Sequence, residues 1–241
     1  MLRKLYFLGE FGYVFRQLLP FLEQSDERFE ILTWEPVCSI INLLWPFKHT
    51  LHNEKEFVTN PQDIFRDMIS YKDKEVIKKI EGFGYNPPMF FNRPQKIFFR
   101  NNCHTLFGIL NKKIMYGEQR KEKKYVSIFP RKRTIREEKN NITQEHIDWL
   151  KENYPGKEIV GHGLDKERID LGIRYCKDVC EQINVFNNSE IFICPPSGLA
   201  DLALLCGCNL MLTGQYPTIE KVNPHNCQIK YWENLTKVIL K

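Results

Sequence analysis

The chain has 241 residues, of which 42% are apolar and 27% are charged, the composition of a globular protein with one large domain or two small ones. Its net charge is +5, but glutamates are interleaved with the basic residues and no zinc-finger, helix-turn-helix or RNA-binding signature is present, so no nucleic-acid partner is expected. No apolar run approaches the roughly 20 residues of a membrane span, and the N-terminus lacks a signal-peptide pattern, so we expect a cytoplasmic protein without a transmembrane segment.

The first half of the chain alternates between strand and helix patterns. An apolar strand over residues 5–8 leads into the glycine-bearing turn Gly9-Glu10-Phe11-Gly12, and apolar residues then recur at helical spacing from Val14 to Leu22. A second parallel strand is expected at residues 29–34. Further elements are an apolar piece at 38–44, a helix at 60–82, a proline-bounded aromatic loop at 87–94, a strand at 96–100 and a helix at 105–115.

A charged break at residues 116–124 predicts a boundary between two domains, 1–120 and 121–241. After it the pattern restarts with a strand at 125–129, a helix at 143–153, a strand at 158–160, a helix at 165–180 and a closing helix at 226–240. Because strands and helices alternate in both halves, the predicted fold class is α/β, with two small Rossmann-like domains that face each other across a cleft.

Residues 190–214 form a complete strand-turn-helix-strand unit. The apolar run 191–194 stops at two prolines, Ser197 is a good N-cap for a helix over 199–206, and Gly207 is a typical C-cap before a strand at 209–212. A helix N-terminus at the carboxyl end of a strand suits a phosphate, so Ser197 and Gly198 are our first candidates for an anion site. The alternative is a purely structural turn, since most such turns bind nothing.

Two other strand ends carry candidate ligand contacts. Arg131, Lys132 and Arg133 follow the strand at 125–129, and arginine suits phosphate oxygens, although a solvated charged loop is the alternative. His162 lies between two glycines at a third strand end. It can contact a nucleotide or an acceptor, or it can be a loop histidine with a backbone partner.

Several stretches resemble the GT-B glycosyltransferases, in particular the heptosyltransferase-like branch. Residues 12–20 (GYVFRQLLP) are similar to the glycine loop and following helix of that family, and residues 197–201 (SGLAD) with Gly207 are similar to its C-terminal Ser/Thr-Gly-Leu segment. Residues 125–133 are similar to its first nucleotide-sugar strand and phosphate loop. The GEFG loop at 9–12 is similar to one in short glycosyltransferases, and the Asn- and Lys-rich composition resembles glycosyltransferases of large DNA viruses, which would place the protein in a host cytoplasm.

The resemblance adds Gly9, Gly12, Tyr13 and Leu199 to the candidate substrate contacts. It implies that residues 1–120 form the acceptor side and residues 121–241 bind the nucleotide-sugar. The chain departs from the family in its short length and at two positions: Tyr13 replaces the acidic base expected after the second loop glycine, and Asp201 replaces a histidine. Glu10 is therefore our first candidate for the catalytic base and Asp201 the second, although either carboxylate can serve a structural role.

The implied reaction transfers a hexose or pentose from a nucleotide diphosphate, with UDP favoured, to a hydroxyl of a glycan or glycoprotein acceptor. No cofactor or metal is expected, because no DxD pair follows a strand and the eight cysteines form no CxxC pair or cluster with histidine. Asn141, Asn187 and Asn234 begin glycosylation triplets, which mean little without secretion. The alternatives are a nucleotide- or sugar-binding module and a nucleotide-sugar epimerase of GT-B architecture, and the oligomeric state is left open.

Overall fold

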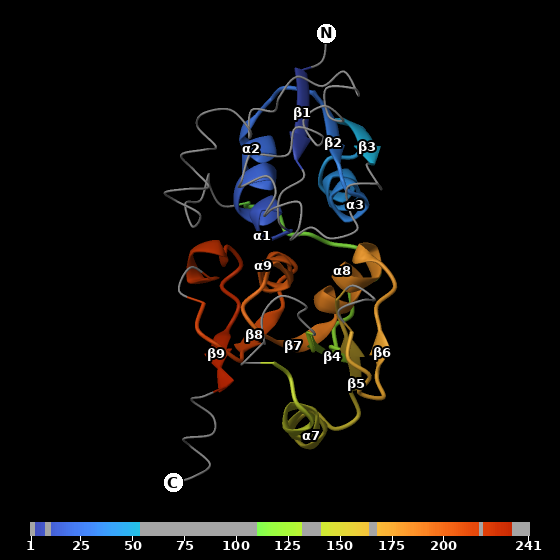
Figure 1. The fold of residues 1–241 in the computed structure, drawn as a ribbon, viewed down its shortest axis with the longest axis vertical. Helices are drawn as coiled ribbons and strands as arrows, with labels where there is room; N and C mark the ends of the chain where they lie inside the picture. Colours follow the sequence, from blue (N-terminus) through green and yellow to red (C-terminus); the bar gives the residue numbers. More distant parts are fainter. Residues whose placement is uncertain are drawn as a thin grey trace, which may run out of the picture. The chain divides into compact units, whose positions relative to one another are not determined.

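The computed structural model describes residues 3–7, 11–53, 110–131, 141–163, 168–216 and 219–232. The chain divides into two compact units, Met1–Leu110 and Asn111–Lys241, each with its own parallel sheet (Figure 1). The division therefore falls ahead of the charged break at residues 116–124 that the sequence predicts as the boundary. That break belongs to the second unit, where the N–H of Arg120 donates to the side-chain oxygen of Asn188 at 2.9 Å.

The first unit is a three-stranded parallel sheet in the order β1-β2-β3, with helices between its strands. Ile31 of the central strand lies opposite Leu5 on one side and Leu51 on the other, which confirms the predicted pairing of the first two strands. The elements are β1 (Arg3–Phe7), α1 (Phe11–Tyr13), η1 (Val14–Leu18), α2 (Leu19–Gln24), β2 (Phe29–Thr33), α3 (Glu35–Leu44) and β3 (Thr50–Asn53).

The helices of the first unit follow from local sequence. The segment from α1 to α2 is helical throughout but passes through a π-helical stretch, η1, just before Pro20, which has no N–H to donate to the helical ladder. In α3 the residues Val37, Ile40, Ile41 and Leu44 are buried, which is the spacing of one helix face. The apolar piece expected at residues 38–44 is thus a helix that packs on its sheet.

The second unit contains a six-stranded sheet in which every strand pair is parallel, in the order β6-β5-β4-β7-β8-β9. Its elements are β4 (Tyr125–Ile128), α7 (Gln144–Asn153), β5 (Glu158–Gly161), β6 (Arg174–Tyr175), α8 (Val179–Asn187), β7 (Ser189–Cys194), α9 (Gly198–Leu205), β8 (Asn209–Leu212), η4 (Ile219–Val222) and β9 (Ile229–Tyr231).

Helices cover both faces of this sheet (Figure 1). On one face α7 contributes Ile147 and Leu150 to a core cluster with Val126, Ile128 and other inward residues of β4, β7 and β8. On the other face lie α8 and α9, where the rings of Phe186 and Phe192 meet at 4.8 Å. Residues alternate between the two faces along each strand, so burial on both sides explains why the inner strands β4, β7 and β8 are mostly buried, while the edge strands β6 and β9 carry Arg174 and Lys230.

Three helix predictions are wrong in the part of the chain that the structure describes. Residues 110–115 of the helix expected at 105–115 are not helical, because Ile114 donates its N–H to the carbonyl of Leu205 at 2.9 Å. Residues 168–178 of the helix expected at 165–180 are not helical: residues 174–175 form β6 against β5, and α8 begins only at Val179. Residues 226–231 of the closing helix expected at 226–240 are not helical, because residues 229–231 form β9 beside β8, and residues from 233 onward lie outside the described residues. The elements expected at 60–82, 87–94 and 96–100 lie outside the described residues.

Candidate functional site

The two central strands of the larger sheet, β4 and β7, mark the point where the strand order reverses. From β4 the chain continues to β5 and β6 on one side, and from β7 it continues to β8 and β9 on the other. The N–H of Phe129 donates to the carbonyl of Ile193 at 3.0 Å, so the two strands remain paired to their carboxyl ends. Ligands of open α/β sheets bind outside the carboxyl ends of the strands at such a reversal, which makes this edge the candidate site.

Ser197 begins α9 directly after β7, as the sequence predicts. Its backbone is extended, with φ −162° and ψ 163°, and its carbonyl accepts from the N–H of Ala200 at 3.0 Å, which makes it the N-cap residue. Its hydroxyl does not cap the helix, and the hydroxyl oxygen is buried without a hydrogen-bond partner among the described residues. Together with the N–H groups that follow from Gly198 onward, this hydroxyl is available to an anion. Leu199 is buried and apolar.

Arg131 lies just past β4 at the same edge of the sheet. Its side chain is 9% exposed, and its guanidinium carbon lies 5.8 Å from the centre of the Phe129 ring. An arginine that lies over an aromatic face is stabilised by a cation–π interaction and keeps the planar N–H donors that suit phosphate oxygens. Lys132 and Arg133 lie outside the described residues, so their part in the site stays a prediction.

The ring beneath Arg131 packs against the turn that follows β5. Gly163 in this turn has φ +115°, and a Cβ placed there would lie 2.6 Å from the Phe129 ring. Glycine is therefore required both for its backbone conformation and for the space that the ring occupies. The ends of β4 and β5 are in this way packed together under the candidate site.

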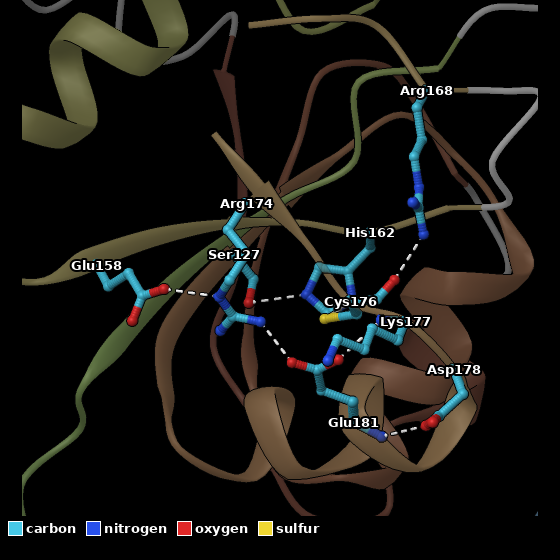
Figure 2. Close-up of polar contacts among 9 residues, drawn as sticks. All are labelled: Ser127, Glu158, His162, Arg168, Arg174, Cys176, Lys177, Asp178 and Glu181. Carbon is cyan, nitrogen blue, oxygen red and sulfur yellow. Dashed lines mark hydrogen bonds and ion pairs between the residues drawn. The ribbon is translucent and has the colours of Figure 1, made fainter. Parts of the chain in front are cut away.

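His162 is directed into the core rather than to the edge of the sheet. The ring is fully buried and stacks on Phe186, with 4.1 Å between centroids. Its Nε2 lies 3.0 Å from the hydroxyl of Ser127 and its Nδ1 lies 3.9 Å from the sulfur of Cys176 (Figure 2). This burial argues against the predicted contact with a nucleotide or acceptor. It favours the structural alternative, although the partners of the ring are side chains rather than the backbone.

The buried histidine predicts a loss of stability in acid. Burial, with a smaller effect of the positive charge of Arg174, lowers the pKa of His162 from 6.5 to about 3. Because the unfolded chain takes up a proton near pH 6.5 and the folded protein does not, the contribution of His162 to stability is complete above pH 6.5. Below that pH the free energy of unfolding falls by about 1.4 kcal/mol per unit, until the pH reaches about 3.

At pH 5 the protonation of His162 in the unfolded chain should lower the free energy of unfolding by about 2 kcal/mol. His162→Gln, which does not titrate, should flatten the pH dependence of the second unit between pH 6.5 and pH 4. Amide hydrogen exchange read by mass spectrometry can follow this unit separately, which is necessary because burial also lowers the pKa of His49 in the first unit to about 4. Equal slopes of the free energy of unfolding against pH, for the unchanged protein and for His162→Gln, would contradict the prediction.

Asp201 is fully buried in the first turn of α9, a helix in which every residue from 199 to 205 is buried. Its Oδ2 accepts a hydrogen bond from the hydroxyl of Tyr216 at 3.2 Å. A general base must reach the proton that it removes. The burial of Asp201 therefore favours a structural role at the positive end of the helix, and its role as a base stays a prediction.

The candidates in the first unit lie before and within α1. Gly9 and Glu10 lie outside the described residues. Gly12, expected in a turn, is instead part of helix α1, as is Tyr13. The ring of Phe11 packs edge-on against Phe15 and Trp34, at 4.9 and 5.8 Å between centroids, and so fixes the start of this helix. The roles of these four candidates in binding and catalysis stay predictions.

The structure also reveals polar contacts that the sequence analysis did not predict. Arg174 donates to Glu158 at 2.8 Å and also to Glu181, so it links β5, β6 and α8 (Figure 2). These side chains are partly exposed, and the network stabilises the edge of the sheet. The sequence did not predict this network, because Arg174 was expected in a helix over residues 165–180 rather than in a strand. Within the described ranges, no group of three or more His, Cys, Asp or Glu residues is placed to hold a metal ion, and no helix is long and apolar enough to cross a membrane.

No protein-family model matches the chain, and no curated protein matches it in sequence. Several solved structures resemble its fold. A glycosyl transferase of family 9 from Veillonella parvula DSM 2008 has a TM-score of 0.56 at 10% identity, over 98% of this chain and 87% of its own. The E. coli heptosyltransferase WaaC with ADP has a TM-score of 0.51 at 11% identity, over 100% of this chain and 99% of its own.

The iron-containing dodecameric glycosyltransferase TibC from enterotoxigenic E. coli H10407 has a TM-score of 0.50 at 15% identity. The match covers 88% of this chain and 57% of TibC, so this chain spans less than two thirds of that protein. Identities this low show the fold alone. They confirm the expected α/β fold class with Rossmann-like, GT-B-like topology, while the cleft expected between the two domains stays a prediction.

Proposed function

We propose that the protein is a glycosyltransferase that moves a sugar from a nucleotide diphosphate to a hydroxyl of a glycan or glycoprotein acceptor. The observation that carries this proposal is the placement of Arg131 and the N-terminus of α9 at the carboxyl ends of the paired strands β4 and β7. A guanidinium and helix N–H groups are the donors that a departing diphosphate needs. The fold shared with glycosyltransferases supports the same reaction.

In the proposed reaction, the acceptor oxygen forms a bond to the anomeric carbon as the bond from that carbon to the diphosphate breaks. The acceptor proton passes to a base, for which Glu10 is the first candidate and Asp201 the second. Arg131 and the N-terminus of α9 stabilise the negative charge on the leaving diphosphate. We propose a metal-independent reaction because these groups can supply the positive charge that a divalent metal supplies in other enzymes.

We further propose that the second unit binds the nucleotide-sugar, that the first unit receives the acceptor, and that the protein acts in the cytoplasm. UDP is the favoured nucleotide. A thermal-shift screen against UDP, GDP, CDP, TDP and ADP tests the donor, because a ligand at about 100 times its dissociation constant adds roughly 2.7 kcal/mol to stability. Release of nucleoside diphosphate only when an acceptor is present then tests transfer. A protein that none of the five nucleotides stabilises would contradict the proposal.

Arg131→Ala should weaken nucleoside diphosphate binding about 10- to 100-fold, the cost of losing a hydrogen bond to a charged group. Calorimetric titration of the folded variant measures this change. Arg120→Ala is the matched control, because Arg120 is an exposed arginine of the same unit that pairs with Glu118 at 3.7 Å. Equal affinities of the Arg131 and Arg120 variants would remove Arg131 from the site.

A second candidate function is a nucleotide- or sugar-binding module without turnover. The full burial of Asp201 favours it, because one of the two candidate bases lies away from solvent. Binding of a nucleotide-sugar without release of nucleoside diphosphate, across a panel of acceptors, would support this candidate. Conversion of the bound sugar without any acceptor would instead indicate an epimerase.

A further inference from the structure

Asn141 holds the backbone of Arg131 through both polar atoms of its side-chain amide. The side-chain oxygen of Asn141 accepts from the N–H of Arg131 at 2.7 Å, and the side-chain nitrogen donates to the carbonyl of the same residue at 2.5 Å. The oxygen also accepts from the N–H of Ile142 at 2.8 Å. These three contacts determine both the position and the orientation of the amide.

Asn141 supplies the backbone hydrogen bonds that a neighbouring strand would supply within the sheet. Strand β4 ends at Ile128, and Arg131 lies beyond it, where the chain leaves the sheet. Asn141 offers Arg131 one donor and one acceptor, as a paired strand does within the sheet. Because Arg131 is 9% exposed, loss of these bonds would leave its backbone groups poorly solvated, so the segment would have to move.

Asn141 is itself anchored to the core. The next residue, Ile142, is buried in the cluster that α7 forms with β4 and β7. The hydrogen bonds therefore connect Arg131 to a rigid part of the second unit. The guanidinium of Arg131 in turn lies over Phe129, whose ring packs on Gly163.

We infer that Asn141 is a positioning residue for diphosphate binding: it fixes the backbone of Arg131 so that the guanidinium is held at the carboxyl ends of β4 and β7. The inference rests on the proposed function. A cation that is already fixed binds a phosphate more tightly than one that must be ordered on binding, because less conformational entropy is lost. Asn141 contributes through Arg131 and need not touch the ligand.

Calorimetric titration with inorganic pyrophosphate, UDP and ADP tests the inference, and pyrophosphate separates recognition of the phosphates from that of the nucleoside. Asn141→Ala should weaken binding of all three probes, with about a tenfold loss for the one that binds the unchanged protein most tightly. In an Arg131→Ala background the same change should have an effect below about twofold, because its target is already gone. A residue that only stabilises the fold would lower the melting temperature without this dependence on Arg131.

Asn153→Ala is the matched control, because Asn153 makes an exposed side-chain hydrogen bond to the carbonyl of Trp149 in the same unit. If Asn141→Ala does not fold, Asn141→Asp replaces it, because aspartate keeps the acceptor and removes the donor. Its binding is then measured with and without Arg131→Ala in the same way. An unchanged protein that binds none of the probes would overturn the proposed function and this inference with it. Binding by the unchanged protein, with a loss for Arg131→Ala but none for Asn141→Ala, or with two losses that simply add, would overturn this inference alone.

Discussion

Replacing Asn187 with alanine should lower the free energy of unfolding of the second unit by about 3 kcal/mol. The buried side-chain nitrogen of Asn187 donates to the carbonyls of Ile114 and Cys206, at 2.9 and 3.0 Å. Its oxygen accepts from the N–H of Tyr116 at 3.0 Å. Alanine would leave several backbone groups without partners, and each such buried group costs about 1–3 kcal/mol.

Amide hydrogen exchange of residues 168–216 measures this loss separately from that of the first unit. Asn153→Ala is again the control, and its single exposed hydrogen bond should contribute less than about 1 kcal/mol. Exchange of residues 110–124 should also accelerate in Asn187→Ala, because this segment is held on the second unit by Asn187 and Asn188. A loss of stability no larger than that of the control would show that the segment is held by other contacts.

The change Glu10→Gln should leave binding of the nucleotide nearly intact and reduce turnover by at least about 100-fold, if Glu10 is the general base. Glutamine keeps the shape of the side chain but cannot accept a proton. Steady-state release of nucleoside diphosphate, with donor affinity measured separately, distinguishes a loss of basicity from a loss of binding. Full transfer activity in Glu10→Gln would remove this residue from catalysis.

Asp201→Asn is the companion experiment. Because Asp201 is buried and accepts from Tyr216, we expect both Asp201→Asn and Tyr216→Phe to change stability more than turnover. If Asp201→Asn abolishes transfer while Glu10→Gln does not, Asp201 is the base despite its burial. If neither change matters, the acceptor proton leaves by another route.

The sequence by itself determines the unit from β7 to β8, because the signals there are local. An apolar run gives the buried strand, two prolines end it, and Ser197 begins the helix. Gly207 has φ +79° at the other end of that helix, a conformation that glycine adopts at little cost. The alternation of such units was sufficient to predict the α/β class.

Local patterns failed where distant residues supply the hydrogen-bond partners. Residues 229–231 have enough apolar character for a helix, but they pair with β8 and satisfy the backbone groups along its outer edge. Residues 110–115 do not form a helix because Leu205 and Asn187 bind the backbone of Ile114. Neither partner can be deduced from the residues nearby in sequence.

The candidate site, like the fold, is predicted only in part by local sequence. The sequence determines that Arg131 and Ser197 each follow a strand, since both strand ends are marked by local apolar runs and prolines. Only the tertiary structure decides that these two strands are neighbours at the reversal of the sheet, that His162 is directed into the core, and that Asn141 holds Arg131. The physical reason is that strand pairing and side-chain burial depend on contacts between residues far apart in the chain, which periodicity and capping signals do not encode.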